Sequence, residues 1–292
     1  MLGKNKDNMT MRRESTKNSL LCPGCRRLIS RDEPVCPYCG LKNPGVWWKN
    51  SRFTAVLTDP SQFVRLIIGV NIVMYVFSLL LNRPGASQGF SPLSFLGPGN
   101  RSLILLGGTG TIPVFQLGRW WSLLSANYLH GGLLHIFFNM YALYQIGPLV
   151  TREFGSYRMI IIYTVSGVLG FLLSVLAGVP LTIGASAAIC GLIGAMIYYG
   201  RSRGGTYGDA VFRQVGGWAI AIVIFGFVVP GINNWGHGGG MLAGGLLGFL
   251  LGYKEKRRES LAHRLEGLAC LAVTGLVLVW AVGSSFYYLL GS

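Results

Sequence analysis

The chain has 292 residues, of which 51% are hydrophobic and only 12% charged, and its mean hydropathy is +0.48. An ordinary soluble domain has about 25% charged residues, so this composition excludes a soluble globular enzyme. The net charge is +15, and 11 of the 25 Lys and Arg residues lie in residues 1–63. In so apolar a protein, a basic terminal region indicates the positive-inside rule and attraction to a lipid bilayer with anionic head groups, so nucleic acid is not an expected partner.

The N-terminal region contains a regular set of cysteines. Four of the six cysteines form two C-x2-C pairs, Cys22 with Cys25 and Cys36 with Cys39. This spacing predicts a zinc ribbon over about residues 20–42, in which four thiolates hold one structural, non-catalytic Zn²⁺. Two disulfides are the alternative, which a reducing cytoplasm disfavours. The first residues lack the apolar stretch of a secretory signal peptide, so the N-terminus is expected to stay in the cytoplasm.

Downstream, the chain is dominated by apolar stretches that approach the ~20 residues needed to cross a membrane as a helix. Seven are found, at residues 64–81, 124–147, 157–179, 184–199, 214–231, 237–253 and 266–290. They predict an all-α polytopic membrane protein with two regions, a cytoplasmic region over residues 1–52 and a transmembrane domain over 53–292. The first connection, residues 82–120, is expected to fold as an external loop.

The orientation follows from the charges of the connections. Basic residues gather in the even-numbered connections, which places these and the N-terminus in the cytoplasm. An odd number of spans then places the C-terminus outside the cell. We expect a multi-pass protein of the plasma (inner) membrane.

Polar side chains at membrane depth are few, and such residues mark function by default because they are costly there. Ser186, His237, His135 and Asn139 all lie near the outer ends of three segments that begin on the same side. His135 and Asn139 are four residues apart and share one helical face. Glycines at intervals of four in the sixth segment, with small residues in the fourth, allow close helix approach. A contact between Ser186 and His237 is therefore possible.

These residues have complementary chemistry for acyl transfer. His237 would act as general base on the Ser186 hydroxyl and then as general acid to the leaving amine. No acidic third member is evident, which indicates a dyad. The Ser186 amide with the His135 and Asn139 side chains would stabilise the oxyanion. For each residue alone, hydrogen bonding for helix packing is the alternative.

Two other histidines are expected to have no catalytic role. We expect His130 to hold the end of the external loop in place. His263 lies in a basic cytoplasmic connection and is expected to be solvated.

The same residues carry a resemblance to the rhomboid intramembrane serine proteases, over about residues 53–292. The motifs are His130-x4-His135-x3-Asn139, Gly184-x-Ser186 followed by Gly191-Leu192-Ile193-Gly194, and His237-x2-Gly240-x3-Gly244. The resemblance implies a Ser186–His237 dyad, an oxyanion site that includes His135 and Asn139, and a bundle of six plus one transmembrane helices. It also implies cleavage of single-pass transmembrane proteins in or near their membrane helix.

The sequence departs from the family pattern at four positions, namely Ser122, Thr151, Ala187 and Cys190. These changes concern loop anchoring and packing around the histidine, and they leave the dyad intact. One alternative is a catalytically silent rhomboid-like protein that binds membrane clients, although the presence of both dyad residues argues against it. A transporter with a histidine-lined polar cavity is another.

Overall fold

The computed structural model describes residues 19–46, 60–82 and 95–290. The chain divides into two compact units, residues 1–59 and 60–292. The predicted domain boundary at residues 52 and 53 lies outside the described residues and stays a prediction.

The first unit is a small β-hairpin with two cysteine turns. Strands β1 (Ser19–Leu21) and β2 (Leu28–Ser30) pair in antiparallel fashion, with Leu20 opposite Ile29. The buried core of this unit contains Cys22, Ile29 and Cys36. A two-stranded hairpin with so few buried side chains is marginal in water. Small units of this kind ordinarily depend on disulfides or a bound metal for their stability.

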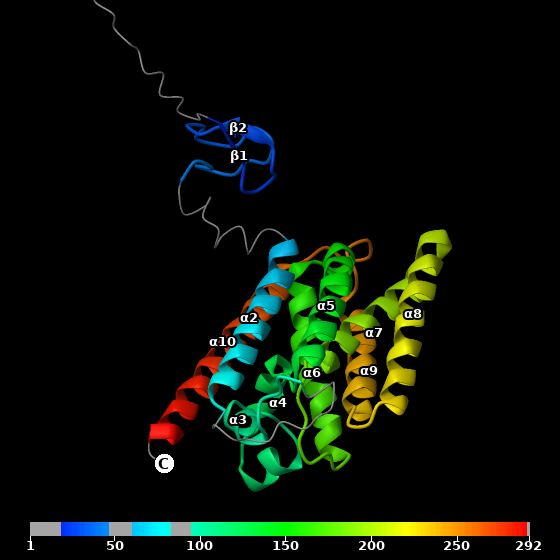
Figure 1. Ribbon diagram of the computed structural model, residues 1–292. Helices are drawn as coiled ribbons and strands as arrows, with labels where there is room; N and C mark the ends of the chain where they lie inside the picture. The colour runs from blue at the N-terminus through cyan, green and yellow to red at the C-terminus, as the bar shows by residue number, and fades with distance from the viewer. Residues whose placement is uncertain (1–18, 47–59, 83–94, 291–292) are drawn as a thin grey trace, which may run out of the picture. The chain divides into compact units, whose positions relative to one another are not determined.

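The second unit is all-α and contains seven helices of 18 residues or more in its described part (Figure 1). They overlap the seven predicted stretches and are α2 (Pro60–Leu80), α5 (Leu133–Phe154), α6 (Ser156–Leu176), α7 (Ser186–Arg203), α8 (Gly205–Val228), α9 (Asn234–Leu251) and α10 (Leu261–Leu290). Five of them are long and apolar enough to cross a membrane; α7 and α9 are less apolar. The predicted polytopic all-α fold is confirmed.

Several helix boundaries differ from the prediction. Helix α5 begins at Leu133 rather than 124, because the chain before Gly131 forms the short helices α4 (Ser122–Ser125) and η3 (Ala126–Tyr128). Helix α7 continues to Arg203 and ends at Gly204, whose φ of +64° is a helix-terminating conformation that favours glycine. It is therefore longer than the predicted stretch 184–199.

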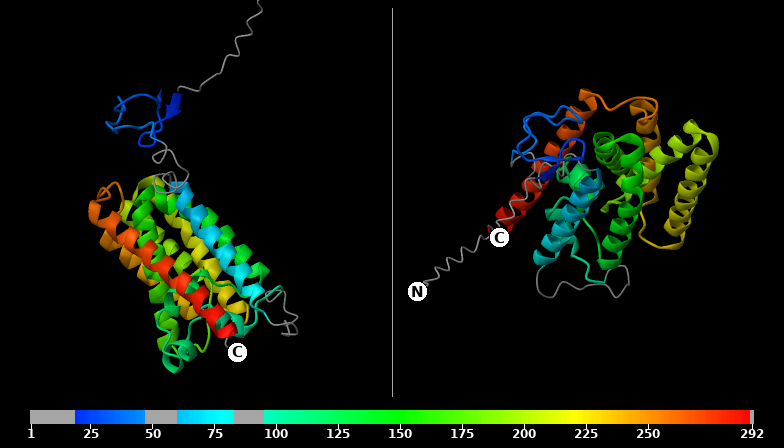
Figure 2. Two further views of the ribbon diagram at one scale, coloured as in Figure 1. Left: turned by 90° about the vertical axis from the view of Figure 1, so that its left-hand side faces the viewer. Right: turned by 90° about the horizontal axis from the view of Figure 1, so that it is seen from above.

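Helix α6 is central in the bundle. Of its apolar stretch 61% is buried inside the protein, against 22% for α8 and for α10. The last two stand at opposite edges (Figure 1; Figure 2). Helices α7 and α9 meet backbone to backbone, because a methyl carbon built at Gly244 would fall 1.9 Å from the carbonyl oxygen of Gly191. The close approach that the glycine spacing predicts is confirmed.

The predicted external loop is folded over its described residues 95–120. It contains α3 (Asn100–Leu105) and the single-turn π-helix η2 (Ile112–Gln116). The Arg119 guanidinium donates a hydrogen bond to the carbonyl of Ile104 (2.8 Å). Thr109 pairs with Thr182 through two backbone hydrogen bonds, which joins this loop to the connection before α7.

The expectation that His263 is solvated is wrong. Its side chain lies in the first turn of α10 and is only 4% exposed, and its Nδ1 accepts a hydrogen bond from the amide of Ser260 (3.0 Å). The cause is the buried guanidinium of Arg158, which needs acceptors away from water. The connection between α9 and α10 wraps around it and provides the carbonyls of Gly252, Arg257 and Arg258.

Candidate active site and metal centre

Ser186 and His237 come together although they are 51 positions apart in the sequence. Ser186 is the first residue of α7 and His237 is the fourth of α9. The Ser186 Oγ lies 2.9 Å from the His237 Nε2, which is hydrogen-bond distance. Gly184 precedes the serine with a φ of +127°, and a methyl group there would fall 2.8 Å from the His135 Nε2. A glycine is therefore required in the turn that delivers Ser186.

The other nitrogen of His237 has no acceptor in the described part of the chain. Its Nδ1 is buried and forms no hydrogen bond there. In a catalytic triad a carboxylate occupies this position. The arrangement is thus a pair, and the orientation of the ring depends on the helix that carries it.

The His135 ring lies next to the turn that carries Ser186, with its Nε2 close to Gly184. The amide of Gly131 donates to its Nδ1 (3.2 Å), so that nitrogen is an acceptor and the Nε2 carries the proton of the neutral ring. The buried His130 packs edge-on against this ring, with 5.1 Å between the ring centroids. Asn139 lies one turn further along α5, where its Nδ2 donates to the carbonyl of His135 (2.9 Å).

Two cavities meet at these side chains. One, of about 290 Å³, lies between α5, α7 and α8 and is lined largely by apolar residues such as Phe138 and Phe225. The other, of about 600 Å³, is lined by the connections before α7 and α9. His135, Ser186 and His237 line both cavities. Ser186 and His237 are therefore reached from an apolar and from a more polar side.

The four departures from the family pattern have specific surroundings. Cys190 is 1% exposed and lines the apolar cavity one turn after Ser186, and the carbonyl of Ala187 faces Gly240 of α9. The Ser122 hydroxyl donates to the Thr109 hydroxyl (2.9 Å), and that of Thr151 donates to a carbonyl of its own helix. All four side chains are accommodated without a charged or unpaired polar group.

Sequence reasoning did not find Asn233, which lies one turn before His237. Its Oδ1 accepts a hydrogen bond from the amide of Gly236 (3.0 Å) and so caps the N-terminus of α9. The available signal was an Asn directly before a helix, because Asn is a preferred N-cap residue.

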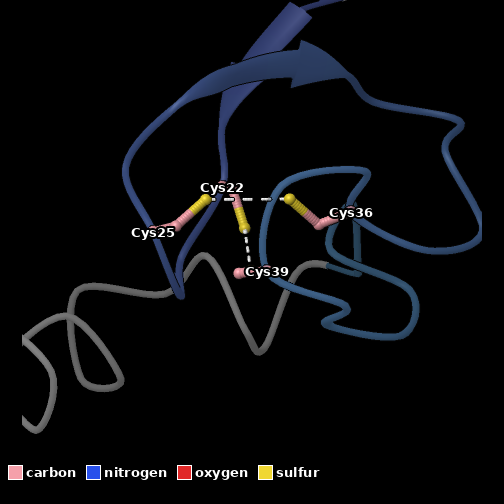
Figure 3. Close-up of side chains that lie close together, drawn as sticks. All are labelled: Cys22, Cys25, Cys36 and Cys39. Atoms are coloured by element: carbon pink, nitrogen blue, oxygen red, sulfur yellow. Dashed lines mark hydrogen bonds between the residues drawn. The ribbon is translucent and has the colours of Figure 1, made fainter.

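The four cysteines of the first unit form one cluster (Figure 3). All four sulfurs lie within 4.8 Å of one another, with 3.6 Å between those of Cys22 and Cys39 and 3.7 Å between those of Cys25 and Cys36. Four sulfurs at ~2.3 Å from one tetrahedral Zn²⁺ lie about 3.8 Å apart, so the set fits this ion. The cysteines are free thiols, not disulfides.

The two cysteine turns have the same backbone design. In each, the amide four residues after the first cysteine donates to that cysteine's carbonyl, as from Arg26 to Cys22 and from Gly40 to Cys36. Both donors have positive φ, +60° and +73°. Burial opposes ionisation of Cys36, but hydrogen bonds from the amides of Tyr38 and Cys39 and from neighbouring thiols outweigh it and lower its pKa to about 7. Despite a hydrogen bond from the Leu41 amide, burial and the thiol hydrogen bonds raise the pKa of Cys39 in the same cluster, so the two thiols do not ionise independently. A thiolate is the form that binds a metal.

The fold is that of a polytopic helical membrane protein in which a serine hydroxyl lies within hydrogen-bond distance of a histidine ring. Residues 117–254 match the family model "Rhomboid domain". RHOMBOID-like protein 6, mitochondrial, from Arabidopsis thaliana is 34% identical over 232 residues, which cover 72% of this chain and 75% of that protein. The chain belongs to the rhomboid family.

Other relatives match a shorter part of their own length. RHOMBOID-like protein 4 from Arabidopsis thaliana is 39% identical over 53% of this chain, and Rhomboid protease GluP from Bacillus subtilis (strain 168) is 34% identical over 62%. These matches cover 40% and 33% of the two relatives. Inactive RHOMBOID-like protein 8 from Arabidopsis thaliana is 33% identical over 59% of the chain, so the family contains members without activity.

Proposed function

We propose that the chain is an intramembrane serine endopeptidase that cleaves transmembrane proteins in or near their membrane helix with a Ser186–His237 dyad. The observation that carries this proposal is the 2.9 Å contact between the Ser186 Oγ and the His237 Nε2, at the junction of two cavities. The relationship to Rhomboid protease GluP supports the same chemistry.

The reaction proceeds in two halves. The Ser186 Oγ attacks the carbonyl carbon of the scissile bond while its proton passes to the His237 Nε2. The tetrahedral intermediate collapses, the C–N bond breaks, and His237 gives the proton to the leaving amine. A water molecule then attacks the acyl ester, His237 takes a proton from it, and that proton returns to the Ser186 Oγ as the carboxylic acid leaves.

Three groups that could donate to the developing oxyanion are the Ser186 amide and the side chains of His135 and Asn139, which line the same cavity as Ser186. The Ser186 amide lies at the N-terminus of α7, where the helix dipole favours negative charge. The protonated Nε2 of His135 lies across Gly184 from this amide, and the Asn139 amide lines the apolar cavity. We propose that His135 and Asn139 stabilise the oxyanion.

We propose single-pass transmembrane proteins as substrates. The apolar cavity between α5 and α8 suits the side chains of a membrane helix, whereas the more polar cavity suits water and an unwound segment. A peptide bond in a regular helix has its carbonyl hydrogen-bonded, so the substrate must unwind before Ser186 attacks. Unwinding is costly in lipid, which favours substrates with Gly, Pro or other helix-weakening residues near the outer end of the helix.

The test uses the purified full chain in proteoliposomes with a single-pass reporter substrate. We expect cleavage and covalent labelling by a serine-reactive fluorophosphonate in the wild type, and neither in Ser186→Ala. The matched control is Ser284→Ala, which removes a serine hydroxyl that donates to the Ala281 carbonyl of its own helix α10. Binding of the reporter without cleavage or labelling would instead favour a silent client-binding protein; one relative, RHOMBOID-like protein 8, is named inactive.

We also infer that Cys22, Cys25, Cys36 and Cys39 bind one structural Zn²⁺ and take no part in catalysis. We further propose a plasma (inner) membrane location with the N-terminus in the cytoplasm and the C-terminus outside. Labelling of cysteines introduced at Lys4 and Ser292 tests the orientation. Labelling of both positions from the same side would contradict it.

A further inference from the structure

The side chain of Asn233 has three polar contacts at the start of α9. Its Nδ2 donates hydrogen bonds to the hydroxyls of Ser174 and Thr182, each at 2.8 Å. Its Oδ1 accepts from the amide of Gly236 at 3.0 Å. The polar groups of this side chain are therefore all occupied, and they join α9 to two other segments.

Both hydroxyl partners belong to well-fixed parts of the bundle. Ser174 is fully buried in α6, where it also donates to the carbonyl of Gly170. Thr182 is 7% exposed, and its backbone pairs in both directions with that of Thr109 in the external loop. The Thr109 hydroxyl accepts in turn from Ser122. Asn233 thus fastens the start of α9 to the central helix and to the external loop.

The same contacts connect the segments that carry the reacting pair. The amide of His237 donates to the carbonyl of Asn233 (3.1 Å), and Thr182 lies four residues before Ser186. The first turns of α9 contain Gly236, and Gly238 to Gly240 follow His237 directly. Glycine is a poor helix former, so these turns have little intrinsic rigidity. The Asn233 cap is held by hydrogen bonds to two other segments, and it compensates for the low rigidity of these turns. It does so at the turn that sets the direction of the His237 side chain.

We propose that Asn233 is a positioning residue for the proposed serine protease reaction, which fixes the first turn of α9 so that the His237 Nε2 stays within reach of Ser186. The role rests on the proposed function. It is needed because the His237 Nδ1 has no partner among the described residues, and no carboxylate there orients the ring. Asn233 helps to orient the His237 ring by fixing the backbone of the turn that carries it.

The neighbouring Asn234 offers a contrast of the same residue type. Its Nδ2 donates to the carbonyl of Gly226 and so joins α9 to α8, away from the connection that delivers Ser186. The positioning role therefore depends on the particular contacts of Asn233. An asparagine at the start of α9 does not by itself provide it.

The experiment compares Asn233→Ala with Asn233→Asp in the full chain, with fluorophosphonate labelling and reporter cleavage as readouts. A displacement of about 1 Å between reacting groups can cost about a hundredfold in rate. We expect Asn233→Ala to lower kcat between tenfold and a hundredfold with KM nearly unchanged. Asp keeps the cap, and the Ser174 and Thr182 hydroxyls can rotate to donate to its carboxylate. Asn233→Asp should therefore recover most of the rate.

A matched control separates positioning from general stability. Ser166→Ala removes a buried hydroxyl of α6 that donates to its own helix, as Ser174 does, but has no bond to Asn233. It should lower thermal stability without lowering the labelling rate per folded molecule. Thr182→Val, which removes one partner, should give an intermediate loss. Combined with Asn233→Ala, it should add less than its separate effect, because both changes break one network.

The outcomes separate the two proposals. If the wild type is not labelled at Ser186, the proposed protease function fails and the positioning role with it. If the wild type is labelled and Asn233→Ala is labelled equally fast, only the positioning role is overturned. It is also overturned if Asn233→Asp is no faster than Asn233→Ala, or if the loss matches the fall in folded fraction.

Discussion

The contact between α7 and α9 should be intolerant of a single methyl group at Gly244. A methyl carbon built there falls 1.9 Å from the carbonyl oxygen of Gly191. A carbon–oxygen contact is ordinarily no shorter than about 3.3 Å, so the backbones must separate by about 1.4 Å. Overpacking of this kind costs about 1–3 kcal/mol, which the gain in helix propensity from Gly to Ala, about 1 kcal/mol, offsets only in part.

Gly245 provides the matched control on the same helix. A methyl carbon there lies 3.6 Å from the carbonyl oxygen of Gly194, an ordinary contact. Gly245→Ala therefore gains helix propensity without strain, and its melting temperature should equal or exceed that of the wild type. Gly244→Ala should melt at a lower temperature. Because α7 and α9 move apart in this variant, the distance between Ser186 and His237 increases, which should slow labelling by up to about a hundredfold.

The assay measures fluorophosphonate labelling of Ser186 per folded molecule, with thermal unfolding in parallel. Equal labelling rates and equal melting temperatures for Gly244→Ala and Gly245→Ala would refute the reasoning. They would show that the two helices can separate without moving the reacting pair.

Three further outcomes are expected. Asn139→Ala and His135→Ala should lower kcat about a hundredfold, or ~3 kcal/mol, with little change in KM; a change in KM alone in reporter kinetics would assign them to packing. Arg158→Met should lower stability by about 3 kcal/mol, because the buried carbonyl of Gly252 and the partly buried ones of Arg257 and Arg258 lose their donor; in the same thermal unfolding measurement, Arg213→Met at an exposed position should change it by less than about 0.5 kcal/mol. Metal analysis should give one zinc per chain, and a chain starting near residue 50 should remain labelled; a folded but inactive truncation would contradict separability.

The helices could be predicted from sequence because the bilayer imposes a simple requirement. A span needs about 20 apolar residues with all backbone groups bonded within the helix, so hydropathy alone indicates where it lies. The ends of a helix are harder to predict from hydropathy. The start of α5 depends on a glycine pair and on short helices before it, and the end of α7 depends on the backbone conformation of Gly204. Neither feature appears in an average over apolar residues.

The candidate site could be predicted from the sequence for a related reason. In a membrane, successive spans alternate in direction, so the order of the spans assigns residues distant in sequence to the same side and to a similar depth, and the charges of the connections say which side that is. Ser186 and His237 were brought together in this way. Asn233 was not, because its role depends on two hydroxyls from separate segments, Ser174 and Thr182. His263 was misjudged because a basic connection suggests solvent, whereas the buried Arg158 draws that connection inward.

The distance between Ser186 and His237 follows from how helices associate in lipid. Apolar side chains gain little there by leaving lipid for protein, so close packing and polar contacts hold helices together. In this chain, close packing and polar contacts act at different positions along α9. Glycines such as Gly240 and Gly244 set its distance from α7, and Asn233 at its start sets the direction of the first turn. A change of the first kind should therefore move the whole helix and lower stability and rate together, whereas a change of the second kind should lower the rate more than the stability.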